Sequence, residues 1–229
     1  GKKEVLKNID LDVYKGTIIG YIGPNGAGKT TTIKMISGIL SPDEGEILIN
    51  GKNIVTQPLE AKKEFGIVPD NADIFLRLKG IEYLNFMADM YEVDNATRQQ
   101  RIQELSETFE MQNALNDKIL SYSHGMRQKI VIMGVLISDP NVWILDEPMT
   151  GLDPQSSYSL KQRMKDHAAK GNTVFFSTHV LEVAEKLCDK VAIINKGSIL
   201  FFGTLEELKA QHPSCDSLEA VFMEVISHA

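Results

Sequence analysis

The sequence predicts an α/β fold in which helices cover a mostly parallel sheet and an all-helical segment interrupts the core. Short apolar runs alternate with helical patterns at both ends of the chain, which is typical of parallel strands joined by helical crossovers. A glycine-rich loop at residues 23–30 directly follows one apolar run, and from about residue 71 to residue 138 apolar side chains recur at helical spacing. We therefore predict one domain over residues 1–229, with a core (1–70 and 139–229) that carries a helical insertion (71–138).

Strands are predicted where short stretches are apolar throughout or alternate with polar residues. Ile9, Leu11 and Val13 alternate with two aspartates, which is the pattern of a half-buried strand. The other runs are mostly apolar, as in strands that helices cover on both faces. In chain order, the predicted strands span residues 9–13, 17–22, 46–50, 65–68, 142–145, 173–177 and 191–195.

Helices are predicted between these strands and throughout the insertion. The first begins in the glycine-rich loop and carries Ile33, Ile36 and Leu40 at helical spacing, and Gly38 together with Ser41-Pro42 ends it. Two more are predicted at residues 157–169 and 180–188. Within the insertion, two sets of residues each fall on one helical face: Ile81, Leu84, Ala88 and Tyr91, and then Ile102, Leu105 and Phe109.

Composition and charge exclude several classes of protein. Hydrophobic residues make up 43% and charged residues 24%, so the chain is neither disordered nor collagen-like. The formal net charge of −7 argues against a general nucleic-acid binder, and we expect no nucleic-acid partner. No apolar run approaches the roughly 20 residues of a membrane span. The two cysteines have no metal-ligand spacing, which favours reduced thiols in the cytoplasm.

The glycine-rich loop fits the phosphate-binding pattern G-x-x-x-x-G-K-[ST]. Its glycines allow backbone N–H groups to converge on one anion, and the following helix adds the positive end of its dipole. Lys29 would bring a full charge to the β- and γ-phosphates, and the Thr30 hydroxyl could ligate Mg²⁺. The predicted nucleotide-binding residues of this region are Gly23, Pro24, Asn25, Gly26, Ala27, Gly28, Lys29, Thr30 and Thr31.

Two carboxylates, Asp146 and Glu147, follow the predicted strand at residues 142–145. The carboxyl ends of strands are where α/β sheets bind ligands. Asp146 could hold Mg²⁺, and Glu147 could orient and deprotonate the water that attacks the γ-phosphate. The other interpretation, an ordinary turn after a buried strand, is less favoured beside a phosphate loop.

Three further sequence landmarks narrow the class of phosphate-loop protein to which the chain could belong. They are residues 121–128 (Ser-Tyr-Ser-His-Gly-Met-Arg-Gln), the segment Gly151-Leu152-Asp153-Pro154, and His179. The chain order of phosphate loop, helical block, Ser-x-Gly segment, acidic strand end, Gly-Leu-Asp-Pro and His resembles that of the ATP-binding subunits of ABC transporters over nearly the whole chain. Tyr-Ser-x-Gly-Met and Leu-Asp-Glu-Pro further resemble the exporter branch that handles antibiotics, sodium or similar cargo. The resemblance implies a P-loop nucleotidase core with an antiparallel N-terminal β region, ATP and Mg²⁺ as cofactors, and ATP hydrolysis.

The resemblance also implies a site that two chains share. Two such domains would pack head to tail, with each ATP between the phosphate loop of one and the 121–128 segment of the other. Ser123 and the backbone N–H of Gly125 would then contact the γ-phosphate across the interface. His179 would stabilise charge on that phosphate, and Asp153 would couple the two sites.

Several positions depart from the family pattern. Asp70 stands where a glutamine usually contacts Mg²⁺ and the attacking water, and it could ligate the metal or act through water. His124 replaces a glycine, and it could help to bind the γ-phosphate or line the interface. Met126 replaces a glutamine that contacts the ribose. The aromatic residue that stacks on adenine would precede Gly1, so Val5 is the remaining candidate contact with the base.

Powering transport requires a membrane permease as a partner, and the resemblance implies a cytoplasmic location at the inner face of the cell membrane. The surface that binds this permease is expected to include Ile74, Phe75, Leu76 and Tyr83; the other interpretation is that these residues belong to the core of the insertion.

Two alternative functions stay open. One is an ABC-type ATPase that acts on nucleic acid or in translation, which the single phosphate loop, the lack of sustained heptads and the negative charge disfavour. The other is an ATP-sensing module with little hydrolysis.

Overall fold

The computed structural model describes residues 4–215 and 217–227. Its centre is a six-stranded sheet in which β8 is antiparallel to β7 and the other neighbours are parallel. The strand order is β4 (Phe65–Val68), β5 (Val142–Asp146), β6 (Thr173–Thr178), β1 (Ile18–Ile22), β7 (Lys190–Asn195) and β8 (Ser198–Gly203). A separate antiparallel hairpin is formed by β2 (Leu48–Ile49) and β3 (Lys52–Asn53). The predicted fold class, a mostly parallel sheet with helices and a small antiparallel β region, is confirmed.

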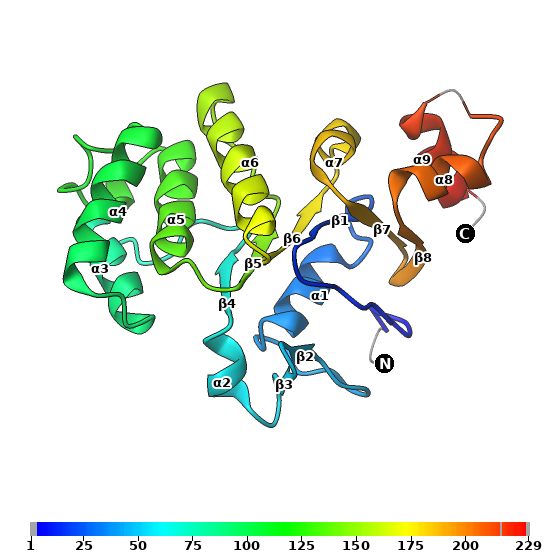
Figure 1. The fold of residues 1–229 in the computed structure, drawn as a ribbon, viewed down its shortest axis with the longest axis horizontal. Coiled ribbons are helices and arrows are strands. Elements are labelled where there is room, and N and C mark those ends of the chain that lie inside the picture. The colour runs from blue at the N-terminus through cyan, green and yellow to red at the C-terminus, as the bar shows by residue number, and fades with distance from the viewer. Residues whose placement is uncertain (1–3, 216, 228–229) are drawn as a thin grey trace.

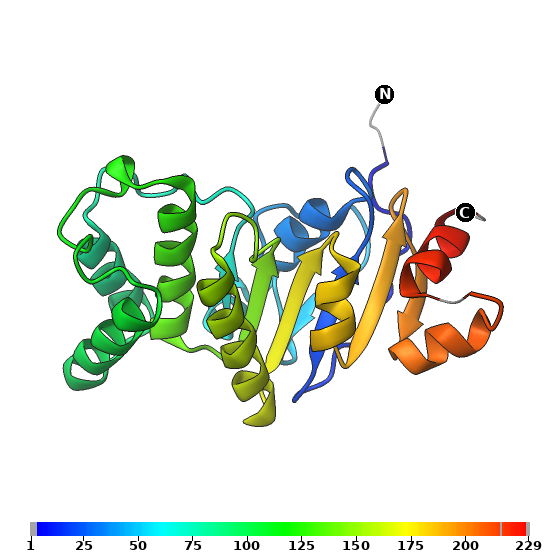
Figure 2. The same ribbon diagram turned by 90° about the horizontal axis from the view of Figure 1, so that it is seen from above.

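Helices cover both faces of the sheet. α1 (Lys29–Ile36) lies on one face, and α6 (Pro154–Ala169) and α7 (Leu181–Leu187) lie on the other (Figures 1 and 2). Successive residues of β6 alternate between two hydrophobic clusters. Val174 and Phe176 belong to the cluster that contains residues of α6, whereas Phe175 belongs to the one that contains Ile33 of α1. Side chains alternate between the faces of a strand, so covering both faces requires the continuous apolar sequence of β6.

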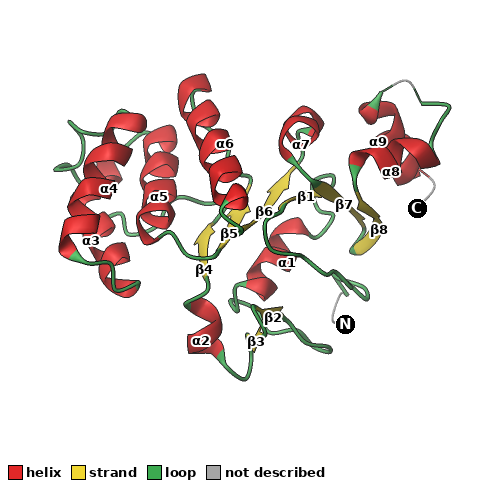
Figure 3. Ribbon diagram, viewed as in Figure 1, coloured by secondary structure: helices red, strands yellow, loops and turns green. Residues whose placement is uncertain are grey.

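The chain between β4 and β5 is helical, as Figure 3 shows. It forms α3 (Gly80–Met90), α4 (Asn95–Thr108), the short 3₁₀ helix η1 (Ile119–Ser121) and α5 (His124–Ser138). The two predicted apolar faces form much of its core, with Leu84, Ala88, Ile102, Leu105 and Phe109 all buried. None of the helices in the described ranges is long and apolar enough to cross a membrane.

The strand predicted at residues 9–13 is wrong. Ile9 and Leu11 do pack against the cluster that contains Ile33, so the alternation marks a half-buried face correctly, but Val13 is exposed and no strand forms in residues 4–17. This N-terminal segment instead passes beside the β7–β8 turn, where the Lys7 N–H donates to the Gly197 carbonyl at 2.7 Å. The strand predicted at residues 46–50 is reduced to the two residues of β2.

Five elements in the described ranges lie outside the sequence-based prediction: β3, α2 (Pro58–Lys62), β8, α8 (Leu205–Gln211) and α9 (Leu218–Ser227). The hairpin that leads into β8 has a local signal. Lys196 and Gly197 link β7 to β8 and both have positive φ, 46° and 84°, as in a two-residue hairpin turn. A glycine flanked by two apolar runs is therefore the feature that could have revealed β8.

Candidate functional site

The phosphate loop connects the buried strand β1 to α1. Gly28 is the N-cap of α1 and has φ 115°, while Gly26 has φ 79°; both values are easily reached only without a β-carbon. Gly23 is needed for a different reason, because a Cβ there would lie 2.3 Å from the Ile194 carbonyl oxygen of β7. The loop is further held to the β7–β8 turn by the Gly197 N–H, which donates to the Ala27 carbonyl at 2.9 Å.

Lys29 joins this loop to the acidic end of β5. Its side chain is 7% exposed, and Nζ donates to the carbonyl oxygens of Gly23 at 2.6 Å and Pro24 at 3.3 Å. Nζ also lies 3.7 Å from Oε1 of Glu147. One ammonium group therefore lies between the phosphate loop and the candidate general base.

Asp146 is a buried carboxylate at the end of β5. Ser177 Oγ, which lies opposite on β6, donates to its Oδ1 at 2.5 Å. Burial raises the pKa of Asp146; the hydroxyls of Ser177 and Thr30 counter this rise by hydrogen bonding, and the charges of Asp70 and Glu147 add to it. The structure therefore brings the three predicted metal-ligand residues, Thr30, Asp70 and Asp146, into one neighbourhood.

Glu147 is held in position from three sides. Its backbone adopts a φ of 48°, which is uncommon for a side chain of this size, and its N–H donates to Ser177 Oγ at 2.9 Å. Oε2 lies 3.0 Å from Nδ1 of His179, whose side chain is 55% exposed. With Lys29 near the other oxygen, the carboxylate faces two groups that can stabilise its charge. Ser177 is the residue that sequence reasoning missed, because its role follows from the β5–β6 register.

A second cluster lies at the N-termini of α5 and α6. Ser123 caps α5 and accepts the Met126 N–H, and Asp153 caps α6. The Asp153 carboxylate is also 2.7 Å from Nζ of Lys129, which with the cap lowers its pKa. A Cβ on Gly125 would lie 2.6 Å from the Gly151 carbonyl, so the two segments are in close contact.

This second cluster is not hydrogen-bonded to the phosphate loop of the same chain among the described residues. In the described ranges, no hydrogen bond or ion pair connects Ser123, Gly125, Met126 or Asp153 with residues 23–31. The His124 ring packs against Gly151, where a Cβ would lie 2.6 Å from Cδ2. Val5, in contrast, lies beside the phosphate loop: a Cβ on Gly28 would lie 3.7 Å from its carbonyl oxygen.

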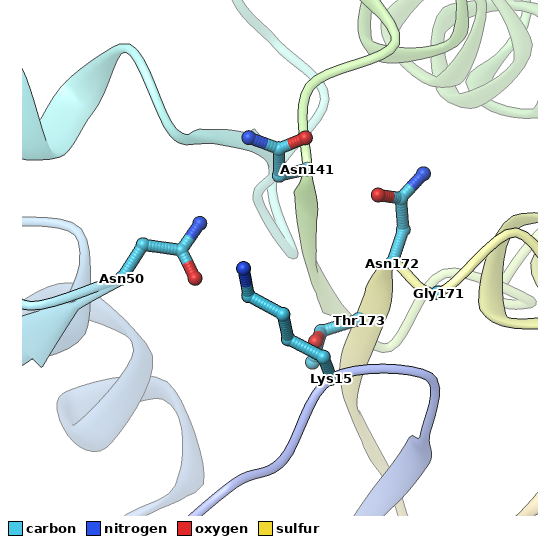
Figure 4. Close-up of a pocket in the computed structure, with 6 residues that line it drawn as sticks. All are labelled: Lys15, Asn50, Asn141, Gly171, Asn172 and Thr173. Atoms are coloured by element: carbon cyan, nitrogen blue, oxygen red, sulfur yellow. The ribbon is translucent and has the colours of Figure 1, made fainter.

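The hollow shown in Figure 4 lies elsewhere on the molecule. It has a volume of about 70 Å³ and is lined by Lys15, Asn50, Asn141, Gly171, Asn172 and Thr173. Asn141 and Asn172 immediately precede β5 and β6, whereas Asp146 and His179 lie at or beyond the carboxyl ends of these strands. A strand rises about 3.3 Å per residue, so the hollow is at the opposite edge of the sheet from the phosphate loop.

Comparisons with known proteins agree with this geometry. Residues 6–150 match the family model described as ABC transporter. The chain is 35% identical over 226 residues to the ABC transporter ATP-binding protein NatA of Bacillus subtilis, covering 97% of this chain and 92% of that protein. It is 37% identical to the linearmycin resistance ATP-binding protein LnrL of the same organism, covering 91% of this chain and 67% of that protein.

A solved structure described as the ATP-binding subunit of an ABC transporter has the same fold. It superimposes with a TM-score of 0.92 at 33% identity, over 96% of this chain and 92% of that chain. The match includes both the sheet and the helices between β4 and β5, since so little of the chain lies outside it. The chain therefore belongs to the ABC transporter family, and it is an ATPase of the kind that forms the ATP-binding subunits of these transporters.

Proposed function

We propose that this chain hydrolyses ATP to power transport by a separate membrane permease, and that two ATP-binding domains pair head to tail around the nucleotide. The single observation that carries the proposal is the position of Glu147. Its carboxylate lies at the end of β5, 3.7 Å from Lys29 Nζ and 3.0 Å from His179 Nδ1. This is a suitable place for a base that accepts a proton from the attacking water.

His179 and Lys29 have complementary roles in this proposal. Lys29 neutralises charge on the β- and γ-phosphates, and His179 contacts the γ-phosphate while its other ring nitrogen stays near Glu147. Because Glu147 is only 14% exposed, little solvent competes for these interactions. Gly23, Pro24, Asn25, Gly26, Ala27, Gly28, Thr30 and Thr31 hold the phosphates, and Val5 is the proposed contact with the base.

The residues around Asp146 fit a magnesium ion. Mg²⁺ prefers oxygen ligands and is usually bound by one or two carboxylates or hydroxyls together with substrate phosphates. Asp146 is a buried carboxylate hydrogen-bonded by the Thr30 and Ser177 hydroxyls, with the Asp70 charge close enough to affect it. We assign Thr30 and Asp146 as metal ligands, directly or through water, with Asp70 in support. When bound, the ion would neutralise charge on the phosphates.

The second cluster supports the proposed pairing. Ser123 and Gly125 lie at the N-terminus of α5, where backbone N–H groups and the helix dipole favour an anion. Among the described residues, neither has a hydrogen bond to the phosphate loop of its own chain, and we propose that they contact the γ-phosphate bound by a second chain. Met126 and Asp153 would lie at the same interface.

The permease is proposed to bind an exposed apolar surface of the helical segment. We name this the docking surface: Phe75, Phe86, Met90 and Leu120, whose exposed fractions are 47%, 40%, 61% and 59%. The rings of Phe75 and Phe86 are 5.4 Å apart, so two members of the surface are in contact. Tyr83, which the sequence also suggested, is buried and belongs to the core. Bound there, the chain would lie on the inner face of the membrane, and residues 71–138 would act as an inserted subdomain.

Glu147→Gln tests this function. The amide keeps the shape of the side chain but cannot accept the proton, so ATP hydrolysis should fall about 100-fold or more. ATP binding should persist, and the variant should form an ATP-dependent dimer in size-exclusion chromatography. Lys29→Ala is the matched control, because it should weaken nucleotide binding itself. Full turnover by Glu147→Gln would refute the general-base assignment, and absence of an ATP-dependent dimer would refute the proposed pairing.

A further inference from the structure

Arg127 connects three segments near the N-terminus of α5. Its Nη1 donates to Asp73 Oδ1 at 2.5 Å, and its Nη2 donates to the Leu120 carbonyl at 2.8 Å. The side chain of Arg127 is 21% exposed and that of Asp73 is 47% exposed, so the pair is partly shielded from water. One guanidinium thus bonds α5 to the loop that precedes α3 and to η1.

The loop that carries Asp73 is itself paired with the chain that leads into α5. The Leu120 N–H donates to the Leu76 carbonyl at 3.0 Å, and the Ile119 N–H donates to the Leu78 carbonyl at 2.9 Å. Farther along the same contact, a Cβ on Gly80 would lie 2.3 Å from the Tyr122 hydroxyl. Residues 73–80 and 119–122 therefore form one packed unit that ends at Ser123.

This unit has two functional ends. Phe75 and Leu120 of the docking surface are at one end, and the capping residue Ser123 is at the other. Arg127 is the side chain that connects them, and its position is not explained by helix stability. A cation near a helix N-terminus interacts unfavourably with the helix dipole. Its Nε is also buried and has no partner among the residues that the structure describes, which is a further cost.

We propose that Arg127 is a positioning residue that fixes the orientation of the N-terminus of α5 relative to the docking surface. ATP-driven pairing of two chains would then depend on the Arg127–Asp73 contact. This inference rests on the proposed function, because it assumes that Ser123 and Gly125 act on the nucleotide of a second chain. Without the guanidinium, the loop and η1 would remain folded, but the orientation of Ser123 relative to them would no longer be fixed.

The experiment measures ATP-dependent dimerisation in the Glu147→Gln background by analytical ultracentrifugation. Arg127→Met keeps the apolar stem and removes the charge, and it should weaken the dimer by about tenfold, as expected for the loss of charge-assisted hydrogen bonds. Arg127→Lys can still pair with Asp73 but lacks the forked geometry, so it should restore part of the affinity. Asp73→Asn combined with Arg127→Met should weaken the dimer no more than Arg127→Met alone.

Arg98→Met is the matched control. Arg98 also belongs to the helical segment, pairs with Asp89, and has a buried Nε without a partner in the described ranges, but it connects α4 to α3. It should lower thermal stability to a similar extent and leave the dimer affinity unchanged. Equal dimerisation of Arg127→Met and its parent, or equal weakening by Arg98→Met, would overturn the positioning role. If the parent itself fails to dimerise with ATP, the proposed pairing is wrong and the inference falls with it.

Discussion

Asp146 is a carboxylate that the fold keeps away from water. It is 2% exposed, and burial is the largest cause of its raised pKa. An ionised group in such a place destabilises the folded chain relative to the unfolded chain, in which it is hydrated. The sheet tolerates it because Ser177 and Thr30 hydrogen-bond the carboxylate. Functional sites commonly trade stability for chemistry in this way.

Replacing Asp146 by asparagine should therefore stabilise the chain while it disables the site. At neutral pH the free energy of unfolding should rise by about 1 kcal/mol, which raises the melting temperature by roughly 2–4 °C for a chain of this size. ATP hydrolysis should fall about 100-fold, since the proposed metal ligand is lost.

The pH dependence of this stabilisation has a definite sign. The pKa of Asp146 is higher in the folded chain than in the unfolded chain. Above the folded pKa, the ionised carboxylate therefore lowers the free energy of unfolding by its full amount. This destabilisation disappears as the pH falls from the folded pKa to the unfolded pKa, because the carboxyl group becomes protonated. The difference in unfolding free energy between Asp146→Asn and the unchanged chain should therefore shrink in acid. A difference that is constant with pH would contradict the assignment.

The small β2–β3 hairpin is fixed to the main sheet through one side chain. Glu64, which precedes β4, pairs with Lys52 of β3 and accepts hydrogen bonds from Asn50 and Asn141, both at 2.8 Å. These bonds, with Lys52 the strongest influence, lower the pKa of Glu64 to about 2. A two-residue strand pair has little stability of its own. Glu64 therefore supplies an attachment that the hairpin itself lacks.

Glu64→Gln should lower the free energy of unfolding by about 1–3 kcal/mol at neutral pH, because the neutral amide cannot replace the pairing with Lys52. A depressed carboxylate pKa stabilises the folded chain fully above the unfolded pKa, and this contribution is lost as the pH falls from about 4.5 to about 2. Urea titrations of both proteins from pH 7 to pH 3 measure the difference. It should be largest at pH 7, and a larger difference at pH 3 would contradict the prediction.

At the scale of the whole molecule, the chain combines a phosphate site on the α/β core with an exposed apolar surface on the helices. α5 packs between the helices and the sheet: its N-terminus is capped by Ser123, and its side chains belong to the cluster that continues into the sheet. Phe75 adopts a φ of 51°, which is uncommon for an aromatic residue, and its ring stays 47% exposed beside Phe86. Exposed aromatic side chains in contact with one another are typical of an interface.

Phe86→Ser should disrupt binding to the proposed permease. Losing an aromatic anchor should weaken the complex by about tenfold or more, as measured by co-purification with a co-expressed candidate permease. Leu59→Ser is the control, because Leu59 is 74% exposed on α2, outside the docking surface. Both variants should unfold near the temperature of the unchanged chain. Equal co-purification of the two variants would exclude Phe86 from the interface.

The fold class and much of the candidate site could be predicted because their signals are local. β4 matches the predicted range of residues 65–68, and β6 extends the predicted range by one residue, since covered strands need continuous apolar sequence. The phosphate loop, Asp146 and Glu147 likewise depend on residues adjacent in sequence. The strand predicted at residues 9–13 failed because alternation reports a half-buried face but does not supply a neighbouring strand to pair with.

The sequence alone determined that this chain is an α/β protein with a phosphate loop, an acidic strand end and landmarks of the ABC transporter family. Only the tertiary structure decided which side chains meet. Ser177 joins Asp146 and the Glu147 N–H because β5 and β6 are paired in one register, and Arg127 reaches Asp73 because α5 packs beside the loop before α3. Tyr83 is likewise buried because of how the elements pack. Local sequence fixes backbone propensity and periodicity, whereas contacts between distant segments depend on how the elements pack.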